Sequence, residues 1–146
     1  MKIEINIDPA CAEPKLVIHT DRMTDEIDAL IRRLSAPRPD AVPAQTERGV
    51  ELLPVEKLIR IYTERQKVYA QTSEAVYPLK FRLYEMEERL KGHPFVRMSS
   101  SELVNTRMIT GMDFSLTGTI RVMLKGGITT YVSRRHVSEI KKLFDI

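Results

Sequence analysis

The chain has 146 residues, of which 42% are hydrophobic and 29% are charged, and it contains a single cysteine, Cys11. This length suits one domain with a small appendage and excludes two large domains. The composition is that of an ordinary globular protein, neither disordered nor fibrous. Apolar runs are only a few residues long, so we expect a cytoplasmic protein with no signal peptide and no membrane insertion. One cysteine excludes an internal disulfide and a thiolate-rich zinc site.

The net charge of +3 is unevenly distributed along the chain. Residues 1–44 contain 6 basic and 8 acidic residues, a net charge of −2, whereas residues 45–146 contain 17 basic and 12 acidic residues, a net charge of +5. Over residues 121–146 the count is 6 basic to 2 acidic. A basic end of this kind is typical of a surface that binds a polyanion, although many domains have such a surface by chance.

The first residues are predicted to form two short strands. Apolar and polar residues alternate over residues 2–7, with Ile3, Ile5 and Ile7 on one side. A second apolar run covers residues 16–18. Alternation of this kind favours β-structure.

A helix and a linker are expected to follow. The helix begins at Thr24, a suitable N-cap, with acidic residues in its first turn and arginines in its last. Its apolar face comprises Met23, Ile27, Leu30, Ile31 and Leu34. Prolines at positions 37, 39 and 43 predict an extended linker over residues 35–44, because proline disfavours helix in the residue before it. We therefore place the domain boundary at residue 44, after a β-β-α segment.

From residue 45 onward the pattern predicts a β-rich domain with short helices. Strands are expected at residues 50–53, 58–62, 68–71, 74–81, 108–114, 119–124 and 128–132, with a mixed stretch at 95–105. Glycines 126 and 127 predict a tight hairpin between the last two strands. One helix is expected at residues 83–90, with Leu83, Met86 and Leu90 on its apolar face, and another from Ser133, with Val137, Ile140, Leu143 and Phe144 as its apolar stripe. The predicted fold class is α+β, mainly antiparallel β.

Two adjacent arginines open the last predicted helix. Arg134 and Arg135 are unfavourable there, because the positive end of the helix dipole repels cations. Together with the Ser133 hydroxyl and free backbone N–H groups, the two arginines could bind nucleic acid. One guanidinium would contact a phosphate of the DNA backbone, and the other would contact the edge of a guanine base. The alternative is that both arginines are solvated or paired with Glu102 or Glu139.

Residues 95–105 (Phe-Val-Arg-Met-Ser-Ser-Ser-Glu-Leu-Val-Asn), followed by Ile109, the hairpin and residues 132–135 (Val-Ser-Arg-Arg), are similar to the LytTR DNA-binding family. The predicted helix at 83–90 fits this order, and the resemblance covers residues 45–146. It implies an elongated, mainly antiparallel β domain whose loops, rather than a recognition helix, enter successive major grooves on one side of double-stranded DNA. It also implies a transcription regulator rather than an enzyme.

The resemblance places Arg135 at a base-reading arginine, and Ser99 and Ser100 just before the family's Ser-x-Leu-Val-Asn core. Many members have a histidine at the Ser99 position, a longer polar residue at Ser100 and an aromatic at Glu102. A serine side chain is shorter than those residues and discriminates bases poorly. Either the two serines contact phosphate, or Arg97 or Arg107 contacts the bases instead. For Arg97 the alternative is an ion pair with Glu102 or with a carboxylate on the acidic helix.

The tip formed by Arg65, Gln66 and Lys67 lies, by the same resemblance, in the loop that reads the other groove. Asn105 and Ser101 are interpreted as turn-forming residues that bond neighbouring backbone groups. For Lys141, Lys142 and His136, contact with DNA and simple solvent exposure both remain open.

No catalytic, cofactor-binding or metal-binding constellation is predicted. The histidines, His19, His93 and His136, are scattered, and neither a glycine-rich phosphate loop nor a cluster with metal-ligand spacing occurs in the sequence. The first 44 residues are too few to fold alone, so we expect them to pack on the LytTR-like domain or to form a homodimer that binds promoter repeats. The alternative function is a protein-interaction module on the same fold with weakened DNA reading.

Overall fold

The computed structural model describes residues 1–35 and 40–146, and the chain divides into two units, Met1–Pro37 and Arg38–Ile146. The prolines predicted for the linker at positions 37 and 39 lie outside the described residues.

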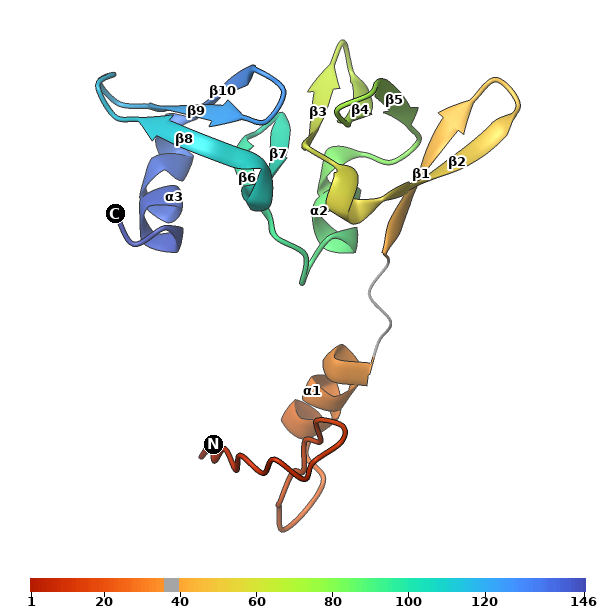
Figure 1. Ribbon diagram of the computed structural model, residues 1–146, viewed down its shortest axis with the longest axis vertical. Coiled ribbons are helices and arrows are strands. Elements are labelled where there is room, and N and C mark those ends of the chain that lie inside the picture. The colour runs from red at the N-terminus through yellow and green to blue at the C-terminus, as the bar shows by residue number, and fades with distance from the viewer. Residues whose placement is uncertain (36–39) are drawn as a thin grey trace. The chain divides into compact units, whose positions relative to one another are not determined.

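The front unit contains helix α1, Asp25–Ser35 (Figure 1). The Thr24 hydroxyl accepts a hydrogen bond from the backbone N–H of Ile27 at 3.2 Å, which confirms Thr24 as the N-cap. Acidic residues occupy the first turn and Arg32 and Arg33 the last, as the sequence predicts. An ion pair of 3.1 Å joins Arg32 to Asp28 one turn earlier.

The two strands predicted before α1 do not form within residues 1–35. Ile3, Ile5 and Ile7 are 83%, 81% and 88% exposed, and no neighbouring segment pairs with them. An alternating pattern specifies which side chains share a face, but a strand also needs a partner for its backbone groups. The prediction of a β-β-α segment is therefore wrong in its two strands.

Strand β1, Ala41–Thr46, begins the second unit and pairs antiparallel with β2, Gly49–Pro54. Val42 and Ala44 are fully buried, so residues 41–44 belong to the folded domain and not to a linker. Pro43 is tolerated because β1 pairs with one strand only. The backbone N–H that proline lacks therefore removes no hydrogen bond to a second neighbouring strand. The boundary predicted at residue 44 is thus several residues too late.

The remaining strands form two further antiparallel sheets (Figure 1). The larger sheet has the order β5-β4-β3-β7-β6, from β3 Arg60–Glu64, β4 Lys67–Gln71, β5 Val76–Leu79, β6 Phe95–Ser99 and β7 Glu102–Asn105. The smaller sheet has the order β10-β9-β8, from β8 Ile109–Asp113, β9 Ile120–Leu124 and β10 Ile128–Val132. Short helices α2, Leu83–Arg89, and α3, Val137–Leu143, complete the unit. The predicted class, α+β and mainly antiparallel β, is confirmed.

Strand β7 lies between two hydrophobic cores. Its side chains alternate, so that Leu103 packs in the core that contains the apolar face of α2, whereas Val104 packs in the core that contains Ile140 of α3. The predicted apolar face of α2 is buried as expected. On α3 the prediction is wrong for Leu143, which is 58% exposed.

The end of β10 leads into a tighter turn than the sequence predicts. Residues Arg134–His136 form one turn of 3-10 helix, and α3 begins only at Val137. The Ser133 hydroxyl does not cap the helix, because it is hydrogen-bonded to Nδ1 of His136 at 2.6 Å. The two arginines therefore lie in the 3-10 turn before α3. The glycine hairpin is confirmed, with Leu124 opposite Ile128 and positive φ values of 83° and 75° at Gly126 and Gly127.

Candidate nucleic-acid interface

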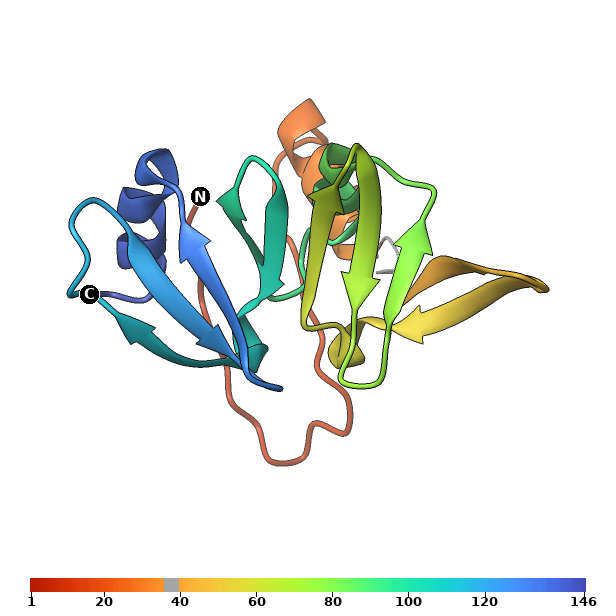
Figure 2. The same cartoon turned by 90° about the horizontal axis from the view of Figure 1, so that it is seen from above.

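Loops from distant parts of the sequence meet at one end of the second unit. The N–H of Thr63 donates to the carbonyl of Ser101 at 2.9 Å, and the N–H of Ser133 donates to the carbonyl of Met98 at 2.8 Å. These bonds join the β6–β7 turn to the β3–β4 hairpin on one side and to the 3-10 turn on the other. Figure 2 shows the β3–β4 and β6–β7 hairpins pointing the same way. We call residues 64–67, 99–101 and 133–136 the loop row. It contains all the predicted site residues: Arg65, Gln66, Lys67, Ser99, Ser100, Ser133, Arg134 and Arg135.

Arg134 and Arg135 are exposed and form no ion pair with an acidic residue of the described chain. Glu102, one predicted partner, is instead paired with Arg60, at 2.8 Å. Pairing with Glu102 or Glu139 is therefore wrong. Both guanidinium groups are left for water or for an added anion, a situation that favours phosphate or base contacts.

A loop that the sequence did not single out lies beside Arg134. A Cβ added to Gly118 would stand 3.3 Å from Arg134 Nε, so the loop between β8 and β9 is in close contact with this side chain. Asp113 shapes the loop by accepting the Ser115 N–H at 2.9 Å and by pairing with Arg121 at 2.9 Å. Hydrogen bonds from the Ser115 side chain and backbone lower the pKa of Asp113, and the Arg121 charge lowers it further. The loop at residues 114–119 carries no charged side chain, so charge patterning could not identify it.

The β3–β4 hairpin has an unusual two-residue tip. Glu64 pairs with Lys67, and the intervening Arg65 and Gln66 have φ values of 51° and 66°. Positive φ at both positions defines a type I′ turn, which strongly favours Asn-Gly. The left-handed conformation costs an ordinary residue roughly 1–2 kcal/mol. Two long, exposed polar side chains thus occupy positions where Asn-Gly would be more stable.

Arg97 holds the β6–β7 turn. Its Nε donates to Glu87 on α2 at 3.0 Å, and its Nη1 donates to the carbonyl of Ser100 at 3.0 Å. Of the predicted alternatives, pairing with the acidic helix is confirmed and pairing with Glu102 is wrong. Ser99 Oγ accepts the N–H of Ser101 at 3.2 Å, so this hydroxyl supports the turn, whereas Ser100 is exposed at its apex.

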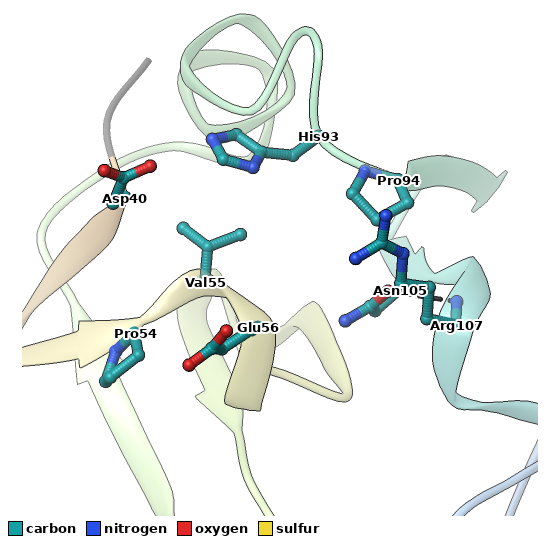
Figure 3. Close-up of a pocket in the computed structure, with 8 residues that line it drawn as sticks. All are labelled: Asp40, Pro54, Val55, Glu56, His93, Pro94, Asn105 and Arg107. Atoms are coloured by element: carbon teal, nitrogen blue, oxygen red, sulfur yellow. Dashed lines mark hydrogen bonds between the residues drawn. The ribbon is translucent and has the colours of Figure 1, made fainter. Parts of the chain in front are cut away.

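Asn105 stabilises the opposite end of β7. It is 1% exposed, and its side chain donates to the carbonyl of Leu58 at 2.8 Å and accepts the N–H of Arg107 at 3.1 Å. The structural interpretation of Asn105 is confirmed. A hollow of about 390 Å³ lies at this end (Figure 3) and is lined by Asp40, Pro54, Val55, Glu56, His93, Pro94, Asn105 and Arg107. Arg107, an alternative base reader, thus lies away from the loop row.

Two further observations, on metal ligands and on membrane-spanning helices, concern residues 1–35 and 40–146. Within this part of the chain, histidine, cysteine and acidic side chains do not gather in groups of three or more that would hold a metal ion. None of the helices described there is both long and apolar enough to cross a membrane.

Comparison with known proteins identifies the family. Residues 48–145 match the family described as LytTr DNA-binding domain. The chain is 31% identical to the uncharacterized HTH-type transcriptional regulator SAS2254 of Staphylococcus aureus strain MSSA476, covering 100% of this chain and 99% of that protein. A relative from bovine strain RF122, SAB2242, is 29% identical over the same shares. The LytTr DNA-binding domain of a Bacillus cereus protein described as a methyl-accepting/DNA response regulator has the same fold, with a TM-score of 0.69 and 24% identity over 73% of this chain and 98% of that one.

The fold and these matches define a β-sheet DNA-binding domain. The relatives carry the words HTH-type in their names, but in the described residues strands separate each α-helix from the next, so consecutive helices do not form that motif. The chain belongs to the LytTR DNA-binding family.

Proposed function

We propose that this protein is a cytoplasmic transcription regulator that binds a specific sequence in double-stranded DNA through the loop row. It acts as a homodimer on promoter repeats and performs no catalysis. The observation that carries the proposal is the pair Arg134 and Arg135, exposed and without an acidic partner in the described chain, beside an exposed serine turn. Guanidinium forks match both phosphate oxygens and the major-groove edge of guanine.

The three parts of the loop row have different roles in this proposal. Arg135 reads a base edge, and Arg134, set against Gly118, contacts phosphate. Ser100 at the apex of the β6–β7 turn contacts phosphate as well, because a serine is too short to discriminate bases well. The tip with Arg65, Gln66 and Lys67 enters a neighbouring groove, so that loops and not a recognition helix make the contacts.

The strained tip provides a direct test of its role. Replacing Arg65 and Gln66 by Asn-Gly supplies the residues that a type I′ turn prefers, so the free energy of unfolding is expected to rise by roughly 1 kcal/mol or more. The same change removes the long side chains, so affinity for the specific DNA is expected to fall about tenfold. Urea unfolding and DNA titration on one variant measure both effects. An Asn-Gly variant that binds DNA as tightly as the original chain would show that the tip serves the fold alone.

The proposed function is tested by selecting bound duplexes from a random DNA pool with the purified full-length protein. The selected duplex is then titrated against a scrambled one at two salt concentrations. Enrichment of a motif bound at least about a thousandfold more tightly than scrambled DNA is expected for a sequence-specific regulator. Affinity should fall with salt, with a log–log slope of about −0.9 for each phosphate neutralised.

A protein-interaction module on the same fold is the second candidate. It is favoured by the Ser99 hydroxyl, whose hydrogen bonds stay within the β6–β7 turn, and by the short reach of Ser100. For this candidate we expect no enriched motif and only weak, salt-sensitive binding. That outcome would leave the fold unchanged and refute sequence-specific regulation.

A further inference from the structure

The first residues of the front unit expose an apolar edge that pairs with no other described segment of that unit. Ile3, Ile5 and Ile7 are more than four-fifths exposed and alternate with polar residues over Lys2–Asp8. Three large aliphatic side chains in a row of this kind indicate an interaction surface rather than scattered surface residues. The alternation fits a strand with one face buried. A strand that lacks a partner in its own chain is open to pairing with another.

The sequence of this segment is complementary to itself. If two copies are placed antiparallel with Ile5 opposite Ile5, then Ile3 lies opposite Ile7 and Lys2 lies opposite Asp8. Each isoleucine faces an isoleucine, and each end of the ladder joins a cation to an anion. Because the arrangement is two-fold symmetric, both Lys2–Asp8 pairs form at once. A shift of the register by two residues would leave Ile3 or Ile7 without a counterpart.

Helix α1 shows the same kind of complementarity. Its first turn is acidic and its last turn contains Arg32 and Arg33, so an antiparallel copy would set acidic ends against basic ends. Three apolar side chains remain available on this helix and before it: Met23, Ile31 and Leu34 are 64%, 36% and 58% exposed. The self-complementary strand sequence and the self-complementary charges of α1 both point to a second copy of the same segment as the partner. One two-fold symmetric contact between two copies would pair both features at once.

We propose that two copies of this protein associate through their front units, with residues 2–8 of each chain forming an antiparallel intermolecular ladder centred on Ile5. This ladder would form the homodimer of the proposed function, but its formation does not depend on DNA binding. The dimer is therefore tested without DNA, and if it does not form, sequence-specific DNA recognition by a monomer would still be possible.

The register is tested by disulfide cross-linking of the full chain with the native cysteine removed by Cys11→Ser. A cysteine at position 5 faces its own copy, within the Cα separation of roughly 4.4–6.8 Å that a disulfide spans. A cysteine at position 7 is offset from its copy by four residues along the strand, about 13 Å. Under mild oxidation we expect Ile5→Cys to give a covalent dimer rapidly and Ile7→Cys to remain monomeric in a denaturing gel.

The charge pairs are tested by measuring dimer dissociation with analytical ultracentrifugation. Lys2→Asp and Asp8→Lys each place like charges opposite one another at both ends of the ladder, so the dissociation constant is expected to rise about tenfold. The double reversal, Lys2→Asp with Asp8→Lys, restores both pairs and is expected to recover most of the affinity. Neither residue belongs to the two hydrophobic cores of the second unit, so the fold of that unit should be unchanged. In the front unit the Asp8 carboxylate accepts the N–H of Ala10 at 2.9 Å, a bond that Lys2→Asp leaves in place.

Several results would overturn the proposal. A monomer across the concentrations used, equal cross-linking from positions 5 and 7, or a double reversal as weak as the single ones would each exclude this ladder. Association only in the presence of lipid vesicles or of another protein would assign the isoleucines to a different partner.

Discussion

Replacing Glu102 by alanine is expected to lower the free energy of unfolding by about 3 kcal/mol. Glu102 is 6% exposed, and its carboxylate accepts hydrogen bonds from Arg60 at 2.8 Å and from the Thr130 hydroxyl. Arg60 also donates to Gln71 at 2.7 Å and stacks over Tyr62, 4.3 Å from the ring centroid. Removing the carboxylate leaves a largely buried guanidinium without its counter-charge, a situation that is costly in a medium of low polarity.

The measurement is urea unfolding of the purified variant, with Glu88→Ala as the matched control. Glu88 pairs with Lys91, but both side chains are about 70% exposed (71% and 70%). Water screens that pair, so we expect its loss to cost less than about 0.5 kcal/mol. A combined Arg60→Met, Glu102→Leu and Thr130→Val variant replaces the network by apolar groups and should recover at least half of the loss. A Glu102→Ala cost below about 1 kcal/mol would contradict the buried-pair argument.

The Glu102 network also has a functional consequence. Glu102 and Arg60 lie on β7 and β3 of the larger sheet, whereas Thr130 lies on β10 of the smaller one. The network therefore links the sheet that carries the β3–β4 tip to the sheet that leads into Arg134 and Arg135. Under the proposed function, a domain that contacts two grooves needs these parts at a fixed separation, and loops gain that precision from rigid strands.

Local patterns predicted both helices and most strands of the second unit because burial there follows the alternation of the sequence, but they gave a linker where β1 lies and only a mixed stretch where β6 and β7 lie. Ile61 and Leu103 enter one core while Val104 enters the other, as period-2 alternation requires. The same rule failed at Ile3, Ile5 and Ile7, because alternation does not supply a partner strand. The proline rule failed at Pro43, because an edge strand tolerates a missing N–H.

The candidate site was predicted in parts and not as an arrangement. The resemblance identified the residues at 65–67, 99–100 and 133–135, but their proximity depends on strand pairing between segments far apart in the chain, such as β3 with β7. The N-cap predicted at Ser133 is wrong because the Ser133 hydroxyl is hydrogen-bonded to His136 Nδ1, a contact that no local sequence pattern indicates. The contact between Gly118 and Arg134 arises only once β8, β9 and β10 are assembled.

Replacing Arg135 by alanine is expected to weaken binding to the selected DNA by about 1–3 kcal/mol, a factor of roughly 5 to 150, with little change on scrambled DNA. Replacing Arg134 by alanine is expected to weaken binding to both sequences alike and to reduce the salt slope by about 0.9. The difference follows from the chemistry of the contacts, because a base edge carries sequence information and a phosphate does not. Titration of each variant against both duplexes at two salt concentrations measures it.

Arg107→Ala is the matched control, since Arg107 is exposed like Arg134 and Arg135 but lies beyond the opposite end of β7, at the hollow beside Asn105. It changes the net charge by the same amount, so any loss caused by charge alone would appear in all three variants. We expect Arg107→Ala to leave both affinities and the salt slope nearly unchanged. Equal losses of affinity for Arg134→Ala and Arg135→Ala on both duplexes would refute the division of roles. An equal loss for Arg107→Ala would place the DNA on another surface, because the position of a cation matters more than its charge only where the interface is localised.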